Sequence, residues 1–159
     1  MTLDIDVVSD FVCPWCRLGR ARLERAVADF LAAHPGRRIR INWLPYFLNP
    51  DTPVAGEAYR PFLERKVGSA RAVDALFARV REAAEPDGLH FAFDAIRVRP
   101  NTLRAHRLIY RAQSRGATPE RVQALVGAVF EAYFVEGRDI GDVDTLADIA
   151  AACGERRER

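Results

Sequence analysis

Cys13 and Cys16, two cysteines separated by two residues, carry the clearest chemistry in the sequence. They follow a short apolar stretch and precede a long amphipathic one, so we expect them at the start of a helix. The free N–H groups and partial positive charge of a helix N-terminus favour a thiolate, which predicts a lowered pKa and a nucleophilic role for Cys13. Residues three apart share a helix face, so Cys16 can form a disulfide with Cys13 or resolve a mixed disulfide.

The residues around the pair support a helix start. Pro14 suits a first turn, where no backbone donor is lost. The ring of Trp15 could tune the thiols or simply cover them. Arg17 and Arg20 are expected to be solvated residues of the helix surface, with stabilisation of a nearby thiolate as the alternative.

The alternative reading of the cysteine pair is a structural role or half of a zinc site. Zinc sites usually have four ligands, and the sequence has no second CxxC or pair of histidines at suitable spacing. We therefore expect no metal and no bound cofactor. The third cysteine, Cys153, is expected to be a buried or half-buried residue near a helix end.

The composition indicates one globular domain with room for an insertion: 159 residues, 49% hydrophobic and 29% charged. The net charge of +2 comes from dispersed arginines, which argues against nucleic-acid or membrane partners. No apolar run approaches the roughly 20 residues of a membrane span, and no secretory signal pattern opens the sequence. We therefore expect a cytoplasmic protein, where a CxxC pair is more often catalytic than structural.

Hydrophobic periodicity predicts a strand over residues 3–8, a helix over 15–33 and a second strand from residue 38. A crossover of this length makes the two strands parallel. Helices are predicted over 59–67, 70–84, 100–115, 119–136 and 142–152, with an extended link over 89–93. Leu103 and Leu108 are expected to face inward. A set of aromatic residues is expected mostly in the core, with some lining a groove: Tyr46, Phe47, Phe91, Phe93, Phe130, Tyr133 and Phe134.

Three motifs in order resemble the FrnE-like branch of the DsbA family. They are Asp10-Phe11-Val12-Cys13-Pro14-Trp15-Cys16, Pro100-Asn101-Thr102 with Ala105-His106-Arg107-Leu108, and Phe130-Glu131-Ala132-Tyr133-Phe134 with Glu136-Gly137-Arg138-Asp139-Ile140. The resemblance covers essentially the whole chain. It implies an α/β fold, a thioredoxin-like strand–helix–strand half over 1–49 with a helical insertion over 50–153, and a charged tail over 154–159. It also implies an active-site disulfide between Cys13 and Cys16.

The resemblance has a further consequence at the end of the insertion. The family's fold continues there with two strands, a final helix and a cis-proline facing the reactive cysteine, which residues 154–159 are too few to supply. We therefore expect a truncated chain, or a homodimer in which a second copy completes the sheet. In the second motif, Asn101 is expected to cap its helix and His106 to be packed or hydrogen-bonded, with a substrate groove as the alternative for both.

Three functions are compatible with the sequence. The first is a thiol–disulfide oxidoreductase that exchanges disulfides with client proteins or small molecules through Cys13 and Cys16. The second is a glutathione-dependent isomerase or transferase of the 2-hydroxychromene-2-carboxylate isomerase or kappa class, whose members typically have serine where this chain has Cys13. The third is an inactive, shortened helical or dimerising module.

Overall fold

The computed structural model describes residues 1–155, and residues 156–159 of the predicted tail lie outside the described residues. The chain begins with β1 (Thr2–Ser9), α1 (Pro14–Ala33) and β2 (Arg38–Pro45). The segment after β2 contains β3 (Glu57–Ala58), α2 (Tyr59–Val67), α3 (Ala70–Ala84), β4 (Val98–Arg99), α4 (Leu103–Ser114), α5 (Pro119–Phe134) and α6 (Val143–Ala152), with two short 3₁₀ turns at Glu85–Asp87 and Phe93–Ala95.

The first sheet pairs β1 with β2 in parallel, from Thr2 opposite Arg38 to Ser9 opposite Pro45. This confirms the predicted strand–helix–strand unit. A second pair, the antiparallel β3 and β4, places Ala58 opposite Val98. The sequence did not predict it, because strands of two residues contain no alternation to detect.

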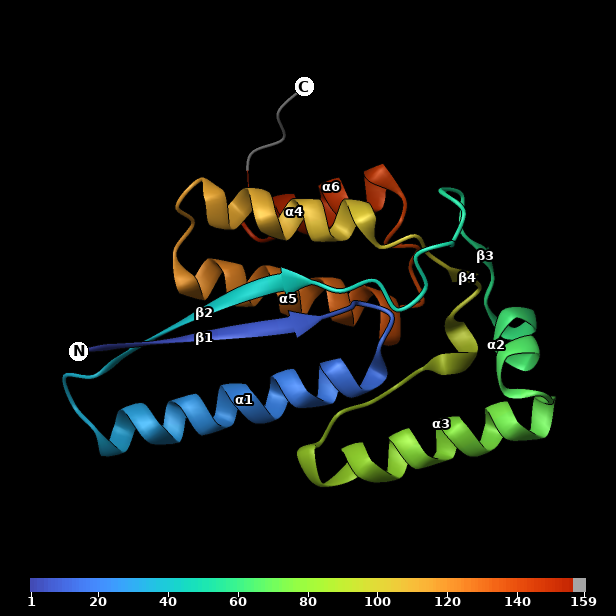
Figure 1. Cartoon of the computed structure of the whole chain (residues 1–159), viewed down its shortest axis with the longest axis horizontal. Coiled ribbons are helices and arrows are strands. Elements are labelled where there is room, and N and C mark those ends of the chain that lie inside the picture. Colours follow the sequence, from blue (N-terminus) through green and yellow to red (C-terminus); the bar gives the residue numbers. More distant parts are fainter. Residues whose placement is uncertain (156–159) are drawn as a thin grey trace.

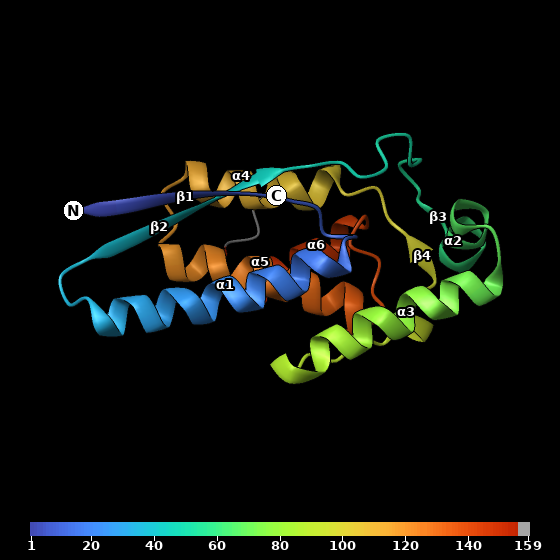
Figure 2. The ribbon, with the colours of Figure 1, turned by 60° about the horizontal axis from the view of Figure 1, so that its bottom comes forward.

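Helix α4 covers the outer edge of β2. The side chain of Gln113 accepts a hydrogen bond from the backbone N–H of Trp43 at 2.8 Å and donates one to its C=O at 3.1 Å. The amide therefore occupies the positions that a neighbouring strand would use. In Figure 1 the two strands run between α1 and α4, and α2 and α3 lie at the end of the molecule remote from residue 1. Figure 2 shows α1 alongside α5, with which it makes contact.

The hydrophobic core lies mainly in the helical segment. Phe77 and Phe93 stack nearly parallel with ring centroids 4.1 Å apart, and Phe91 packs edge-on against Phe134 at 5.2 Å. Among the described residues before residue 50, only Phe11, Leu18 and Trp43 are buried apolar residues. The strand–helix–strand unit is therefore the thinly packed part of the molecule.

The predicted helices are all present, but one apolar side chain lies elsewhere than expected. Leu103 was wrongly predicted to face inward: it is 40% exposed, because α4 meets the core through Ala105, Ile109 and Ala112, which lie on a different face of the helix. The aromatic set is mostly in the core as expected: five of its seven members are buried, and the exceptions are Tyr46 and Phe47. Both are exposed after the end of β2, where the chain leaves the sheet.

Candidate active site

The cysteine pair lies where the sequence placed it, at the start of α1. Cys13 is the N-cap residue, and its Sγ accepts the backbone N–H of Cys16 at 3.2 Å. Pro14 occupies the first turn as expected. The backbone N–H of Cys13 donates in turn to the C=O of Asp10 at 3.2 Å, so a tight turn joins β1 to the helix.

Both thiols are free and half-buried, and they are hydrogen-bonded to each other. The hydrogen bond from Cys13 is the main reason why the pKa of Cys16 falls to about 6, and the backbone N–H of Asp10 and the hydroxyl of Ser9 lower it further. The same contact with Cys16 raises the pKa of Cys13. The sequence predicted a lowered pKa for Cys13, whereas its pKa is raised, because the sequence argument considered the helix end and not the hydrogen bond with Cys16.

This geometry lets the pair exchange one proton internally. At neutral pH one thiolate is present, held on Cys16 by the thiol of Cys13. Transfer of that proton along the hydrogen bond moves the thiolate to Cys13, at the N-cap, without release of a proton to solvent. The nucleophilic role of Cys13 stays a prediction, and it is compatible with this exchange.

Trp15 lies beside the pair with a side chain that is 43% exposed. The backbone N–H of Trp15 bonds to Cys13 and lowers the pKa of that thiol. The hydrogen bond with Cys16 and burial have larger effects and raise it. The indole therefore presents apolar surface next to the thiols, where a partner would dock.

Arg17 is not the solvated residue that the sequence predicted. Its side chain is 8% exposed and donates to Glu131 at 3.0 Å and to the C=O of His90, with the guanidinium 4.7 Å from the centroid of the Phe91 ring. Arg20 is half-buried and donates to the C=O of Gln123 at 2.9 Å. The two arginines fix α1 against the helical segment, a contact that the one-dimensional pattern of the helix does not reveal.

Asp10 is the site residue that the sequence analysis missed. Its carboxylate accepts the backbone N–H groups of Phe11 at 2.8 Å and Leu48 at 2.9 Å, and lies 3.1 Å from Nε2 of His106. The available signal was an acid at the end of an apolar strand, three residues before a cysteine, where burial requires a partner.

The N-cap residue of α4 is Thr102 and not Asn101 as expected, but the Oδ1 of Asn101 accepts the backbone N–H of Leu103, the first residue of the helix, at 3.0 Å. The amide of Asn101 also donates to the C=O of Thr52 at 2.8 Å, so it ties the helix start to the loop after β2. His106 is hydrogen-bonded, as expected. A substrate groove at these two residues stays a prediction.

Cys153 is half-buried at the end of α6, which confirms its predicted place.

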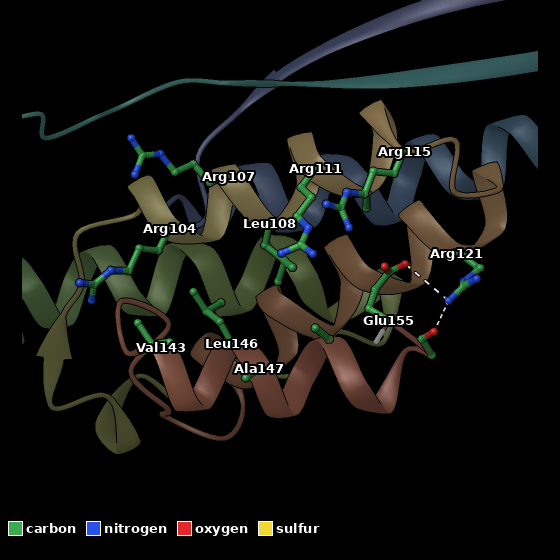
Figure 3. Close-up of a pocket in the computed structure, with 13 residues that line it drawn as sticks. Arg104, Arg107, Leu108, Arg111, Arg115, Arg121, Val143, Leu146, Ala147 and Glu155 are labelled. Carbon is green, nitrogen blue, oxygen red and sulfur yellow. Dashed lines mark hydrogen bonds and ion pairs between the residues drawn. The ribbon is translucent and has the colours of Figure 1, made fainter. Parts of the chain in front are cut away.

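A cavity of about 590 Å³ lies away from the pair, between α4 and α6 (Figure 3). Arginines of α4 line one side, and Leu146 and Ala147 of α6 line the other. Some of its guanidinium groups are already bound: Arg104 donates to the C=O of Gly141 at 3.0 Å, and Arg121 lies 3.5 Å from Glu155.

Residues 1–155 contain neither a metal-binding cluster nor a membrane-spanning helix. No group of three or more His, Cys, Asp and Glu side chains in this range is placed to hold a metal ion. None of the helices formed by these residues combines the length and the apolar character of a membrane span.

Comparisons with known proteins agree with the motifs. The model of the DSBA-like thioredoxin domain family matches residues 4–159. YwbO, an uncharacterized protein of Bacillus subtilis strain 168, is 27% identical over 155 residues, which cover 97% of this chain and 68% of that protein.

Solved structures show the same fold. The crystal structure of a probable DsbA oxidoreductase from Streptomyces coelicolor matches 97% of this chain with a TM-score of 0.80 and 26% identity, and the chain spans 64% of its length. A 2-hydroxychromene-2-carboxylate isomerase gives a TM-score of 0.59 at 19% identity over 98% of this chain and 67% of that one, a likeness of fold alone. The predicted fold class is confirmed: a thioredoxin-like α/β unit with a large helical insertion.

Proposed function

Since the chain belongs to the DSBA-like thioredoxin domain family, we propose that it is a thiol–disulfide oxidoreductase whose redox pair is Cys13 and Cys16. The observation that carries the proposal is the hydrogen-bonded thiol pair at the N-terminus of α1, with the pKa of Cys16 lowered to about 6. A cysteine buried alone in apolar surroundings has a raised pKa and no second thiol as a partner, whereas in this pair one thiol bonds the other and the pKa of Cys16 is lowered.

The proposed reaction has two exchange steps. In the first, the proton of Cys13 passes to Cys16, and the Cys13 thiolate attacks one sulfur of a client disulfide. A Cys13–client bond forms, the client S–S bond breaks, and the departing client thiolate takes a proton from water. In the second step Cys16 loses its proton and attacks Cys13, which releases the second client thiolate. The client gains two electrons and the pair becomes a disulfide, and the reverse sequence oxidises a client dithiol.

The clients we propose are disulfides or dithiols of proteins or small molecules. Exposed apolar residues beside the pair, Trp15 among them, offer surface for such a client. The direction of electron flow follows from the reduction potential of the pair relative to that of its partner.

Three single variants test the proposal: Cys13→Ser, Cys16→Ser and, as a matched control, Cys153→Ser. The assay is the reduction of insulin in the presence of dithiothreitol, with client adducts detected by mass spectrometry. We expect Cys13→Ser to reduce turnover to the uncatalysed rate. Cys16→Ser should also lose turnover while accumulating a mixed disulfide at Cys13, because the resolving thiol is absent. Cys153→Ser should retain the wild-type rate.

The pattern of adducts assigns the two roles. If Cys13→Ser retained wild-type turnover, the proposed mechanism would be wrong. Adducts on Cys16 in the Cys13→Ser variant, with none on Cys13 in the Cys16→Ser variant, would exchange the roles of the two cysteines. Saturable binding of reduced glutathione without consumption of thiol would favour the isomerase or transferase class instead.

A further inference from the structure

Asp10 contacts both cysteines and the helical segment. Its backbone C=O accepts the N–H of Cys13 at 3.2 Å, and its backbone N–H bonds to Cys16. Its carboxylate accepts from Leu48 after β2 and from His106 of α4. Asp10 therefore links the turn that holds the redox pair to His106 of α4, which is distant in sequence.

His106 has a defined hydrogen-bonding role in this contact. Its Nε2 lies 3.1 Å from Oδ1 of Asp10 and 3.2 Å from the C=O of Tyr46. Both neighbours are acceptors, so Nε2 carries the proton and donates to them. The ring contacts the rings of Phe11 and Phe47, whose centroids each lie 5.1 Å from its own, and the His106 side chain is 9% exposed. The donor is therefore fixed in orientation and shielded from water.

The charge of Asp10 opposes the ionisation of Cys16. Its negative carboxylate raises the pKa of that thiol, although the hydrogen bonds to Cys16 have the larger effect. A hydrogen bond from His106 withdraws negative charge from the carboxylate, and so weakens this opposition. The hydrogen bond from His106 to Asp10 is therefore expected to lower the pKa of Cys16.

We propose that His106 is a positioning residue for the redox pair, which acts through Asp10 to make Cys16 a better resolving thiolate. This inference rests on the proposed function. Its effect is largest in the second exchange step. There Cys13 is bonded to the client and can no longer donate a proton to Cys16, so the thiolate retains only the hydroxyl of Ser9 and the backbone N–H of Asp10. In that step Cys16 releases its proton to water, and its electron pair forms the bond to Cys13.

The ionisable groups that interact with Asp10 in the described part of the chain are Cys16, His106 and Tyr133. Burial raises the pKa of Tyr133 well above its ordinary value, so this phenol stays neutral in the range where thiols titrate. A change in the titration of Cys16 can therefore be traced to Asp10 and His106.

The test measures the pKa of Cys16 alone, in a Cys13→Ser/Cys153→Ser background, from the thiolate absorbance near 240 nm. We expect His106→Leu to raise this pKa by about one unit, the effect of a nearby charge that has lost its partner. His106→Gln, which keeps a donor, should restore most of the difference. Asp10→Asn should lower the pKa, and adding His106→Leu to Asp10→Asn should then have no further effect.

A matched control separates positioning from mere packing. Gln113→Leu removes a different side-chain contact of α4, the one with Trp43 of β2, and should lower the free energy of unfolding without moving the pKa of Cys16. If His106→Leu left the pKa unchanged, or shifted it equally with Asp10→Asn present, the inference would be overturned. If His106→Leu did not fold, the His106→Gln and Asp10→Asn titrations would decide. No turnover is measured, so this outcome is independent of the test of the proposed function.

Discussion

The strand–helix–strand unit of residues 1–49 and the helical segment of residues 50–155 differ in how much apolar surface they bury. The helical segment contains a continuous aromatic core, whereas the first unit contributes three buried apolar residues, two of which flank the cysteine pair: Phe11 and Leu18. The cysteine pair thus lies on the less densely packed unit. The geometry of the pair also depends on the better packed helical segment, because Arg17 contacts Glu131 and Asp10 contacts His106.

This difference in packing predicts which property a substitution in each part changes. A change in the helical core should alter stability first, and activity only through it. A change near the pair should alter thiol chemistry at little cost in stability, because few buried atoms are lost. Substitutions and changes of pH test this contrast, and their expected effects on the free energy of unfolding range from several kcal/mol to a fraction of one.

The largest effect is expected for Phe134→Ala in the helical segment. Phe134 is fully buried and packs against Phe91 and Tyr133, so its removal leaves a cavity. We expect the free energy of unfolding to fall by about 3–5 kcal/mol in chemical denaturation. The matched control is Phe30→Ala on α1, where the ring is more than one third exposed. Its cost should be about 1 kcal/mol or less, and equal costs for the two variants would contradict the contrast.

An intermediate effect is expected from pH acting on the pair itself. The pKa of Cys16 is about 6 in the folded reduced protein, below the ordinary value of 9.0. Between these values the unfolded chain binds more protons than the folded one, so the stability of the reduced form rises with pH. The gain is fully present near pH 9 and is lost as pH falls through 6. The oxidised protein has no Cys16 thiol to titrate, so its stability lacks this dependence on pH.

Urea unfolding of the reduced and oxidised proteins at several pH values measures this effect. The difference between their free energies of unfolding should change steadily between pH 6 and 9, in favour of the reduced form as pH rises, and level off below pH 6. Because other groups titrate alike in both forms, the difference isolates the thiols. A difference that did not vary over this window would show that Cys16 titrates normally.

The sequence predicted the order of elements well because periodicity is a local signal. The helix boundaries at Pro14 and Pro119 follow from proline in the first turn, and the parallel pairing of β1 and β2 follows from the length of the crossover. The place of the cysteine pair at a helix start and the fold class were likewise predictable, from the motif at Cys13 and its neighbours.

The contacts between the two parts of the molecule were not predictable in the same way. The sequence around Arg17 has the pattern expected of a solvated arginine. Its burial comes from contacts with distant residues, namely Glu131, the C=O of His90 and the ring of Phe91. The lower pKa of Cys16 arises in part from Ser9 and Asp10, whose orientation depends on how β1 turns into the helix. Such effects depend on three-dimensional placement, and no spacing along the chain encodes them.

The smallest effect is expected for Glu131→Gln, at the ion pair that joins the two parts. Arg17 is buried but Glu131 is 53% exposed, so water screens their attraction. The amide that replaces the carboxylate could still accept a hydrogen bond, and Arg17 keeps the C=O of His90 and the ring of Phe91. We expect a loss of about 0.5 kcal/mol or less and an unchanged pKa of Cys16. The measurements are denaturation and thiol titration of the same sample. A cost comparable to that of Phe134→Ala would show that the link between the parts, and not the helical core, dominates the stability of this fold.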